Sequence, residues 1–254
     1  KDAGIETSTY FQALGKVTSD YQTIAVSGAH GKTTTTLMIK TIMENLGKKA
    51  NAIVGDGNYT YADSDLFIVE ACEYRRQFLS LTPDILVITN ISYDHPDCYN
   101  SIDEVQEAFG QLVSQTNDNA LVIGYDQDPR VMKVLQAAEK KGLKTETFGQ
   151  EVVQFEADGW GSNSILKLKD KEISLHLDLP GRHNVLNGLG AIKAVSRIGV
   201  DPQEAATALK GFTGARRRLE KIGQLGKATL IDDYGHHPEQ IRAVLDSLRD
   251  VYPD

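Results

Sequence analysis

The sequence predicts an α/β protein whose core is a doubly wound, mostly parallel sheet. Short apolar runs alternate along the chain with longer segments in which apolar residues recur at helical spacing. The short runs are apolar at consecutive positions, which is typical of strands that helices cover on both faces. Gly47 and Gly142 stand where two of the helices would end. This alternation favours parallel strands joined by crossover helices.

The first part of the chain contains the predicted parallel sheet. Residues 1–20 have too few apolar side chains for a core and are predicted to be a linker with one helical turn near residues 10–14. The predicted strands cover residues 23–27, 66–70, 85–90 and 120–124. The predicted helices between them cover residues 33–46, 101–116 and 129–141.

From about residue 151 to residue 178 the apolar runs become shorter and alternate with polar residues. The runs at 152–156, 164–169 and 172–177 are separated by short turn sequences, which predicts a small antiparallel segment. Two helices are predicted to follow, at residues 183–198 and 202–210. The second helix has Asp201 as its N-cap and Pro202 at its first position.

The end of the chain carries one more predicted strand, at residues 227–232, and a helix that begins near Pro238. This helix has Ile241, Val244, Leu245 and Leu248 on one face. A single strand and helix cannot bury their apolar sides alone, so residues 221–254 are interpreted as the first β-α unit of a truncated Rossmann-like domain. Because the chain begins at Lys1 rather than Met, it is expected to be a piece of a longer protein.

The composition is that of a soluble globular protein. Of the 254 residues, 41% are hydrophobic and 24% are charged, and no apolar run is long enough to span a membrane. The net charge of -8 argues against a nucleic-acid partner. Two cysteines, Cys72 and Cys98, are too few for a disulfide scaffold and favour a reducing cytoplasm.

Residues 23–36 combine an apolar strand, a glycine loop and a Lys-Thr pair that opens a helix. This order suits a phosphate-binding loop, because glycines let backbone N–H groups curl around an oxyanion and the helix N-terminus adds positive potential. Lys32 can reach the terminal phosphates, and the Thr33 hydroxyl can hold Mg²⁺. The loop is shorter than the usual P-loop, whose first glycine would fall at Val26. The residues assigned to it are Gly28, Ala29, His30, Gly31, Lys32, Thr33 and Thr34.

Two further predicted strands end in groups that suit metal or proton chemistry. Glu70 ends one strand and Glu73 follows it closely, while His95 lies just after the strand at 85–90. Ligands of open parallel sheets bind at such strand ends. Glu70 and Thr33 could hold Mg²⁺, and His95 could hold a second metal ion or transfer a proton. Taken singly, each group could instead be structural; their coincidence with the glycine loop favours one shared site.

The second half of the chain offers groups for the rest of a nucleotide. Asn184 and Asn187 share a helix face and could contact an adenine edge, although Asn184 could also cap its helix. Arg218, in a run of three arginines, could bind phosphate, and Asp233 follows a strand where a carboxylate could bind ribose hydroxyls. A zinc site at His95 and Cys98 is disfavoured, because paired close ligands are lacking.

These motifs, taken together and in this order, resemble those of the Mur ligases, the amide-forming enzymes of peptidoglycan synthesis. The resembling segments are residues 28–36, 70–76, 89–91, 94–97, 181–184, 217–218 and 232–238. The resemblance implies that residues 21–220 are a central ATP-binding domain and that residues 221–254 begin a C-terminal domain. A UDP-binding N-terminal domain would be absent from this chain.

The resemblance also implies a reaction and a set of roles. UDP-N-acetylmuramate would be activated by ATP as an acyl phosphate and would then react with the amine of L-alanine. Lys32, Glu70 and His95 would be catalytic, with Thr33 and Glu70 on a first Mg²⁺ and His95 on a second metal ion. The nucleotide would contact the glycine loop together with Asn184, Asn187, Arg218 and Asp233. The substrates would contact Arg75, Arg76 and His236.

One departure and three alternatives accompany this interpretation. Some Mur ligases carry a carbamylated lysine that supports the second magnesium, but no lysine occurs between Lys49 and Lys133. The alternatives are a family member that recycles tripeptide onto the same sugar nucleotide, a nucleotide-binding fragment without activity, and a P-loop kinase or NTPase.

Overall fold

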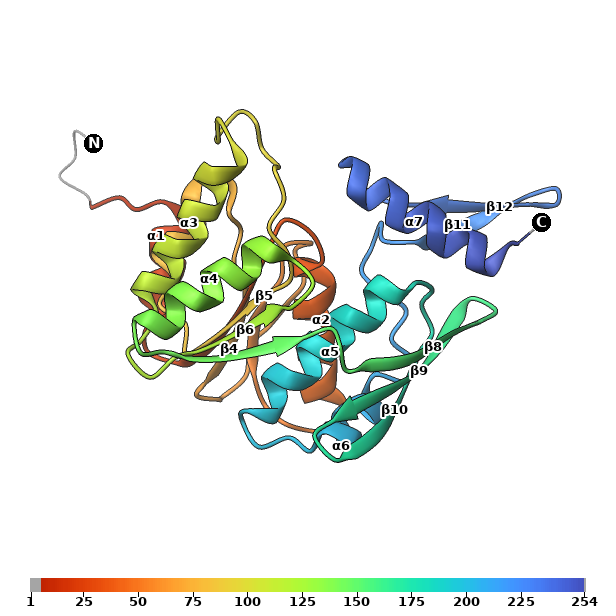
Figure 1. Ribbon diagram of the computed structural model, residues 1–254, viewed down its shortest axis with the longest axis horizontal. Helices are drawn as coiled ribbons and strands as arrows, with labels where there is room; N and C mark the ends of the chain where they lie inside the picture. Colours follow the sequence, from red (N-terminus) through yellow and green to blue (C-terminus); the bar gives the residue numbers. More distant parts are fainter. Residues whose placement is uncertain (1–5, 254) are drawn as a thin grey trace.

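The computed structural model describes residues 6–253 and contains a seven-stranded sheet in the order β3-β2-β4-β1-β5-β6-β7 (Figure 1). Neighbouring strands are parallel except for β2 and β3, which are antiparallel. The strands are β1 (Gln22–Ser27), β2 (Asn51–Ile53), β3 (Tyr59–Thr60), β4 (Leu66–Glu70), β5 (Ile85–Ile88), β6 (Leu121–Tyr125) and β7 (Lys144–Phe148). The predicted mostly parallel sheet is therefore confirmed.

Helices cover both faces of this sheet, and each face has its own apolar core. Along β1, Ile24 and Val26 face one core while Ala25 faces the other, as the alternation of side chains along a strand requires. The first core is closed by α2 (Lys32–Asn45), α5 (Arg182–Ser196) and α6 (Pro202–Ala208). The second is closed by α1 (Tyr10–Thr18), α3 (Ile102–Gln115), α4 (Pro129–Lys140) and the 3₁₀ segment η1 (Tyr74–Ser80).

The small antiparallel segment is confirmed as a three-stranded sheet. It consists of β8 (Val152–Asp158), β9 (Gly161–Leu168) and β10 (Lys171–Leu177), with β9 in the middle. Ile173, Leu175 and Leu177 on one face of β10 pack into the core beside α5 and α6. This sheet thus extends the first core and leaves its other face polar.

The end of the chain forms a hairpin and a helix rather than a single strand and a helix. The hairpin pairs β11 (Glu220–Leu225) with β12 (Ala228–Asp232), and α7 (Pro238–Val251) follows. Strand β11 was not predicted, because its residues are mostly exposed and form no apolar run. Apolar side chains such as Ile222 and Leu225 stay 61% and 73% exposed on this hairpin.

Several other elements differ from the prediction. Strands β2, β3 and β7 were not predicted, because β2 and β3 are very short and β7 is largely polar. A nine-residue α1 replaces the single predicted turn within the linker, whose residues 1–5 lie outside the described residues. A Thr9 capping box and an apolar contact of Leu14 with the second core hold α1 in place. Within residues 6–253, no helix has the length and apolar character needed to cross a membrane.

Candidate active site

The carboxyl ends of β1, β4 and β5 meet at one edge of the sheet. Val26 of β1 is paired with both Glu70 of β4 and Val87 of β5, so the loops that follow these three strands lie side by side. The glycine loop follows β1 and leads into α2 (Figure 1). The register therefore brings the three predicted strand-end motifs together.

The glycine loop is tied to the residues after β5. Asn90 accepts a hydrogen bond from the His30 backbone N–H at 3.0 Å and donates from its amide to the His30 carbonyl at 2.9 Å. Gly28 has a φ of 137°, and a Cβ there would lie 2.0 Å from the Thr89 hydroxyl. Only glycine is compatible with this close approach and backbone conformation.

Two adjoining cavities lie on either side of the loop. The loop-side cavity, of about 800 Å³, lies against the strand ends and is lined by residues that include Lys32, Thr33, Glu70, Asp94, His95, Arg218 and His236. The helix-side cavity, of about 460 Å³, lies against the N-terminus of α5 and is lined by residues that include Thr34, Asn184, Asn187, Arg218, Asp233 and Glu239. The two cavities adjoin one another, because they share the lining residues His30, Gly31, Thr33, Arg218 and Gln240.

In the loop-side cavity, the ammonium of Lys32 is paired with the carboxylate of Glu73. The Lys32 Nζ lies 3.0 Å from Glu73 Oε1 and also donates to the Ala29 carbonyl at 3.2 Å. Burial opposes the charge of Lys32, but the surrounding anions, chiefly Glu73, raise the pKa of Lys32 above its ordinary value. Burial likewise opposes the charge of Glu73, yet Lys32 and His95 lower the pKa of Glu73 to about 2. Both groups are therefore ionised at neutral pH.

Glu70, at the end of β4, and Thr33, in the first turn of α2, both line the loop-side cavity. The Glu70 carboxylate accepts a hydrogen bond from the Gly55 N–H at 2.7 Å. Gly55 allows this contact, because a Cβ there would lie 2.4 Å from Glu70 Oε1. The cavity thus holds oxygen atoms of the kind that Mg²⁺ prefers, on two elements that face the same space.

His95 lies beside a second set of acidic groups. Its Nε2 is 3.6 Å from Glu73 Oε1 and 3.9 Å from Asp94 Oδ2, and its backbone has a positive φ of 59°. The Glu73 carboxylate raises the pKa of His95 above its ordinary value, although partial burial opposes this. Glu73, Asp94 and His95 lie close enough together to hold one metal ion. His236 approaches the same group, with its Nε2 3.8 Å from Asp94 Oδ2.

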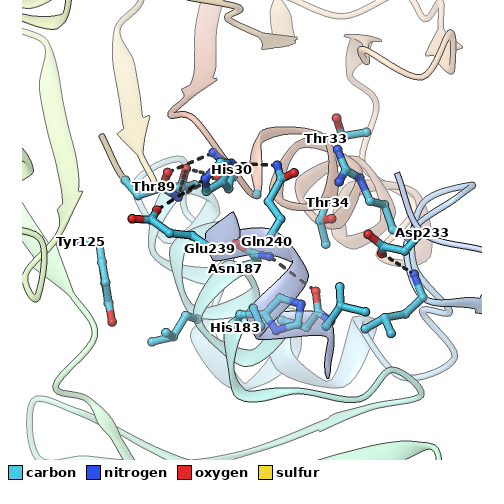
Figure 2. Close-up of a pocket in the computed structure, with 18 of the residues that line it drawn as sticks. His30, Thr33, Thr34, Thr89, Tyr125, His183, Asn187, Asp233, Glu239 and Gln240 are labelled. Atoms are coloured by element: carbon cyan, nitrogen blue, oxygen red, sulfur yellow. Dashed lines mark hydrogen bonds and ion pairs between the residues drawn. The ribbon is translucent and has the colours of Figure 1, made fainter. Parts of the chain in front are cut away.

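The helix-side cavity contains the predicted nucleoside groups (Figure 2). The Asn184 amide donates to the Pro180 carbonyl at 2.7 Å, and Asn187 Nδ2 lies 3.5 Å from Asn184 Oδ1. Asp233 accepts from the backbone N–H groups of Leu219 and Gly235, at 2.9 and 2.6 Å. These bonds fix the orientation of Asp233 and order the turn that follows β12.

Two predicted substrate contacts lie elsewhere. Arg75 stacks over the ring of Tyr74, and Arg76 donates to Gln111 of α3 at 2.8 Å. Both arginines have positive φ values, of 50° and 56°, which turn η1 away from a regular helix. Neither arginine is among the residues that line the two cavities.

Three residues that the structure brings to the site were not predicted as site residues. Glu73 pairs with Lys32, while Glu239 and Gln240 reach the glycine loop from the start of α7. Glu73 could have been predicted, because it follows a strand that is expected to be buried, and a buried carboxylate needs a charged partner. Glu239 and Gln240 are ordinary first-turn residues of a helix, and nothing in the sequence connects them with His30.

Residues 26–195 match the family described as the Mur ligase middle domain, and residues 217–254 match the family described as the Mur ligase, glutamate ligase domain. UDP-N-acetylmuramate–L-alanine ligase of Desulfitobacterium hafniense is 35% identical over 270 residues, which cover 100% of this chain and 58% of the relative. The same-named protein of Rubrobacter xylanophilus is 37% identical over 94% of this chain and 54% of the relative.

A solved structure is similar as well. The crystal structure of UDP-N-acetylmuramate-alanine ligase MurC from Thermotoga maritima superimposes with a TM-score of 0.79 at 27% identity. This match covers 96% of the present chain and 57% of the Thermotoga chain. The chain thus spans a little over half the length of the relatives that it matches.

Proposed function

The chain belongs to the Mur ligase family, and we propose that its full-length protein joins L-alanine to UDP-N-acetylmuramate at the expense of ATP. The names of the relatives at 35 and 37% identity support this choice of substrates. The observation that carries the proposal is the convergence of Lys32, Thr33, Glu70 and His95 on one cavity at the N-terminus of α2. Because the chain covers only part of these relatives, the activity is proposed for the whole protein.

The residues around the loop-side cavity fit a triphosphate and a divalent cation. Lys32 supplies a buried positive charge, and the N-terminus of α2 adds its unpaired N–H groups and its dipole. Position 31 requires glycine, because a Cβ there would lie only 2.5 Å from Asn187 Oδ1. Thr33 and Glu70 are proposed to hold Mg²⁺, which would supply charge neutralisation to the phosphates.

The proposed reaction has two steps. A carboxylate oxygen of the sugar nucleotide bonds to the γ-phosphorus as the bond from that phosphorus to the β-γ bridging oxygen breaks and ADP leaves. The amine of L-alanine then bonds to the acyl carbon, inorganic phosphate leaves, and the amine loses its proton. Lys32 and Arg218 would neutralise the charge on the phosphates, and His95 would hold a second cation near the carboxylate. No group for the role of a carbamylated lysine is assigned.

The helix-side cavity is proposed to hold the nucleoside. Asn184 and Asn187 would face the adenine, and Asp233 would face the ribose. Since both Asp233 oxygens already accept backbone hydrogen bonds, ribose would have to use their remaining lone pairs. Three residues are proposed to contact the substrates. The position of His236 in the loop-side cavity supports its role. Arg75 and Arg76 instead contact Tyr74 and Gln111, and these positions do not support a contact with substrate. ATP and a nucleotide sugar as substrates favour a cytoplasmic location.

The proposal is tested with the full-length protein. Phosphate release and amide formation should require ATP, Mg²⁺, UDP-N-acetylmuramate and L-alanine together. Absence of phosphate release in that mixture would refute the proposal. Turnover with a tripeptide but not with L-alanine would instead identify the tripeptide-recycling member of the family, and phosphoryl transfer to a hydroxyl acceptor would identify a kinase.

The isolated 254 residues provide a second test. We expect this fragment to bind ATP weakly and to form no amide, because it spans a little over half of its relatives. A fluorescence titration with an ATP analogue, with and without Mg²⁺, measures the binding. Amide formation by the fragment would contradict this expectation.

A further inference from the structure

The side-chain amide of Gln240, at the start of α7, has its orientation set by the backbone. Its Oε1 accepts hydrogen bonds from the N–H groups of His236 and His237, at 3.0 and 3.3 Å. An N–H donor needs an acceptor, so the atom facing these two groups must be the amide oxygen. The NH₂ group of Gln240 therefore points the other way, toward the glycine loop (Figure 2).

The NH₂ group of Gln240 meets a ring nitrogen of His30. Gln240 Nε2 lies 2.7 Å from His30 Nδ1. Because the amide nitrogen can only donate, Nδ1 must accept and cannot carry a proton. Burial, with help from His237 and Lys32, lowers the pKa of His30 to about 4, so the ring is neutral at pH 7. A neutral ring without a proton on Nδ1 carries it on Nε2.

The Nε2 atom of His30 is buried and lacks a hydrogen-bond partner among residues 6–253. The carboxylate of Glu239 comes within 3.6 Å of it, which is too far for a hydrogen bond, and that same oxygen already accepts from the Ser92 hydroxyl at 2.6 Å. A buried donor without a partner is costly, so native proteins rarely keep one without a use. His30 lines both cavities, so a bound ligand can supply the missing acceptor.

We infer that Gln240 is a positioning residue that holds His30 in the Nε2–H tautomer, ready to donate to a phosphate oxygen of the nucleotide. The inference rests on the proposed function for the identity of the ligand. An anionic oxygen can accept from this donor, because the Lys32 ammonium and the N-terminus of α2 favour negative charge, although the Glu239 carboxylate opposes it. The residue that orients the donor lies 210 positions further along the chain than His30 itself. Phosphate binding by the loop therefore depends on α7 being docked against it.

The tautomer can be read directly by NMR of the full-length protein labelled with ¹⁵N in its histidines. Spectra that correlate ring nitrogens with carbon-bound ring protons distinguish protonated from unprotonated nitrogens, and a His30→Gln variant assigns the signals. In the ligand-free wild type at pH 7, we expect the His30 proton on Nε2. In Gln240→Glu, a carboxylate oxygen faces Nδ1, so the proton should move to Nδ1. Gln224→Glu, the same change at an exposed position of β11, should leave the wild-type pattern.

A proton on Nδ1 in the wild type, or a His30 pattern that Gln240→Glu leaves unchanged, would overturn the inference. Neither reading requires a nucleotide, so both remain informative if the proposed function fails. Failure of the proposed function would be seen separately, as an absence of ATP binding by the wild-type protein.

The consequence for binding is tested by a double-mutant comparison. Gln240→Leu should weaken binding of an ATP analogue about tenfold when His30 is present, because the donor is no longer held toward the ligand. In a His30→Gln background, Gln240→Leu should have no further effect. Equal losses in the two backgrounds would mean that Gln240 only stabilises α7, and would contradict the inference.

Discussion

The ammonium of Lys32 lies 3.0 and 2.9 Å from the two carboxylate oxygens of Glu73, and both side chains are buried, at 12 and 1% exposure. The lysine of the glycine loop is thus neutralised by a residue that follows β4. A triphosphate would have to compete with this carboxylate for Lys32. The ion pair compensates the buried positive charge of Lys32, which would be costly without a partner.

The first prediction concerns the stability of this pair. Lys32→Met and Glu73→Gln should each lower the free energy of unfolding by about 3 kcal/mol, because each leaves the partner charged and buried. The double variant should lose clearly less than the sum of the two. Urea unfolding of the four proteins measures the coupling. The more exposed pair Lys40 and Glu44 on α2, treated in the same way, should show coupling of only about 0.4 kcal/mol. Additive losses at Lys32 and Glu73 would show that their charges are not coupled.

The second prediction concerns nucleotide binding. Lys32→Ala should weaken binding of an ATP analogue by at least about 100-fold, as expected for loss of a buried cation from phosphate. Lys48→Ala, which removes an exposed lysine just after α2, is the matched control and should bind normally. Measuring both by fluorescence titration tests the role of the loop. Unchanged affinity in Lys32→Ala would mean that the loop does not bind phosphate.

The third prediction separates metal binding from nucleotide binding. Glu70→Gln keeps an acceptor for the Gly55 N–H, so the fold should be retained, but it replaces a charged Mg²⁺ ligand by a neutral one. Titrations should show that the gain in affinity produced by Mg²⁺ falls about tenfold, while metal-free binding is unchanged or slightly tighter. An undiminished Mg²⁺ effect would remove Glu70 from the proposed metal site.

The fourth prediction uses two glycines with similar backbone conformations. Gly31 and Gly57 have φ values of 82° and 87°, so a Gly→Ala change at either should cost about 1 kcal/mol of stability. Only at position 31 does the added Cβ meet another group, at 2.5 Å from Asn187 Oδ1. Gly31→Ala should therefore weaken nucleotide binding strongly, whereas Gly57→Ala should leave it intact. Similar affinities for the two variants would argue against a tight loop beside Asn187.

The fifth prediction concerns stability at acidic pH. Burial lowers the pKa of His183, which packs against Ser247 of α7, from 6.5 to about 4. The unfolded chain binds a proton at this residue more readily than the folded chain does. Stability is therefore full above pH 6.5 and is lost as the pH falls toward 4.

Titration of His183 alone should lower the free energy of unfolding at pH 5 by up to about 2 kcal/mol relative to pH 7.5. Urea unfolding of wild type and His183→Gln at both pH values isolates the contribution, because the variant lacks the titrating group. An identical pH dependence in His183→Gln would show that His183 does not titrate in this way.

Much of the central fold follows from local pattern. Apolar runs predicted β1, β4, β5 and β6, because strands that are covered on both faces must be apolar at every position. The strands that were missed are very short or lie at a sheet edge, where one side meets water and the pattern is mixed. In β7, for example, only Phe148 is fully buried. Strand β11 was missed for the same reason, whereas its partner β12 corresponds to the strand predicted at residues 227–232.

The candidate site divides in a similar way. Lys32, Thr33, Glu70 and His95 were singled out because each follows a strand or opens a helix in a recognisable motif, and they line one cavity. Arg75 and Arg76 lie in one of the same motifs, but the irregular backbone of η1 turns their side chains toward Tyr74 and α3. Their proposed contact with substrate stays a prediction without support from their position.

The sequence by itself determined the alternation of strands and helices, the glycine loop and the charged groups at the strand ends. These depend on periodicity and spacing, which are properties of neighbouring residues. Only the tertiary structure decided that Glu73 neutralises Lys32 and that Gln240 contacts His30. Those contacts join segments that are 41 and 210 positions apart, and their geometry comes from how the sheet and α7 pack rather than from local preference.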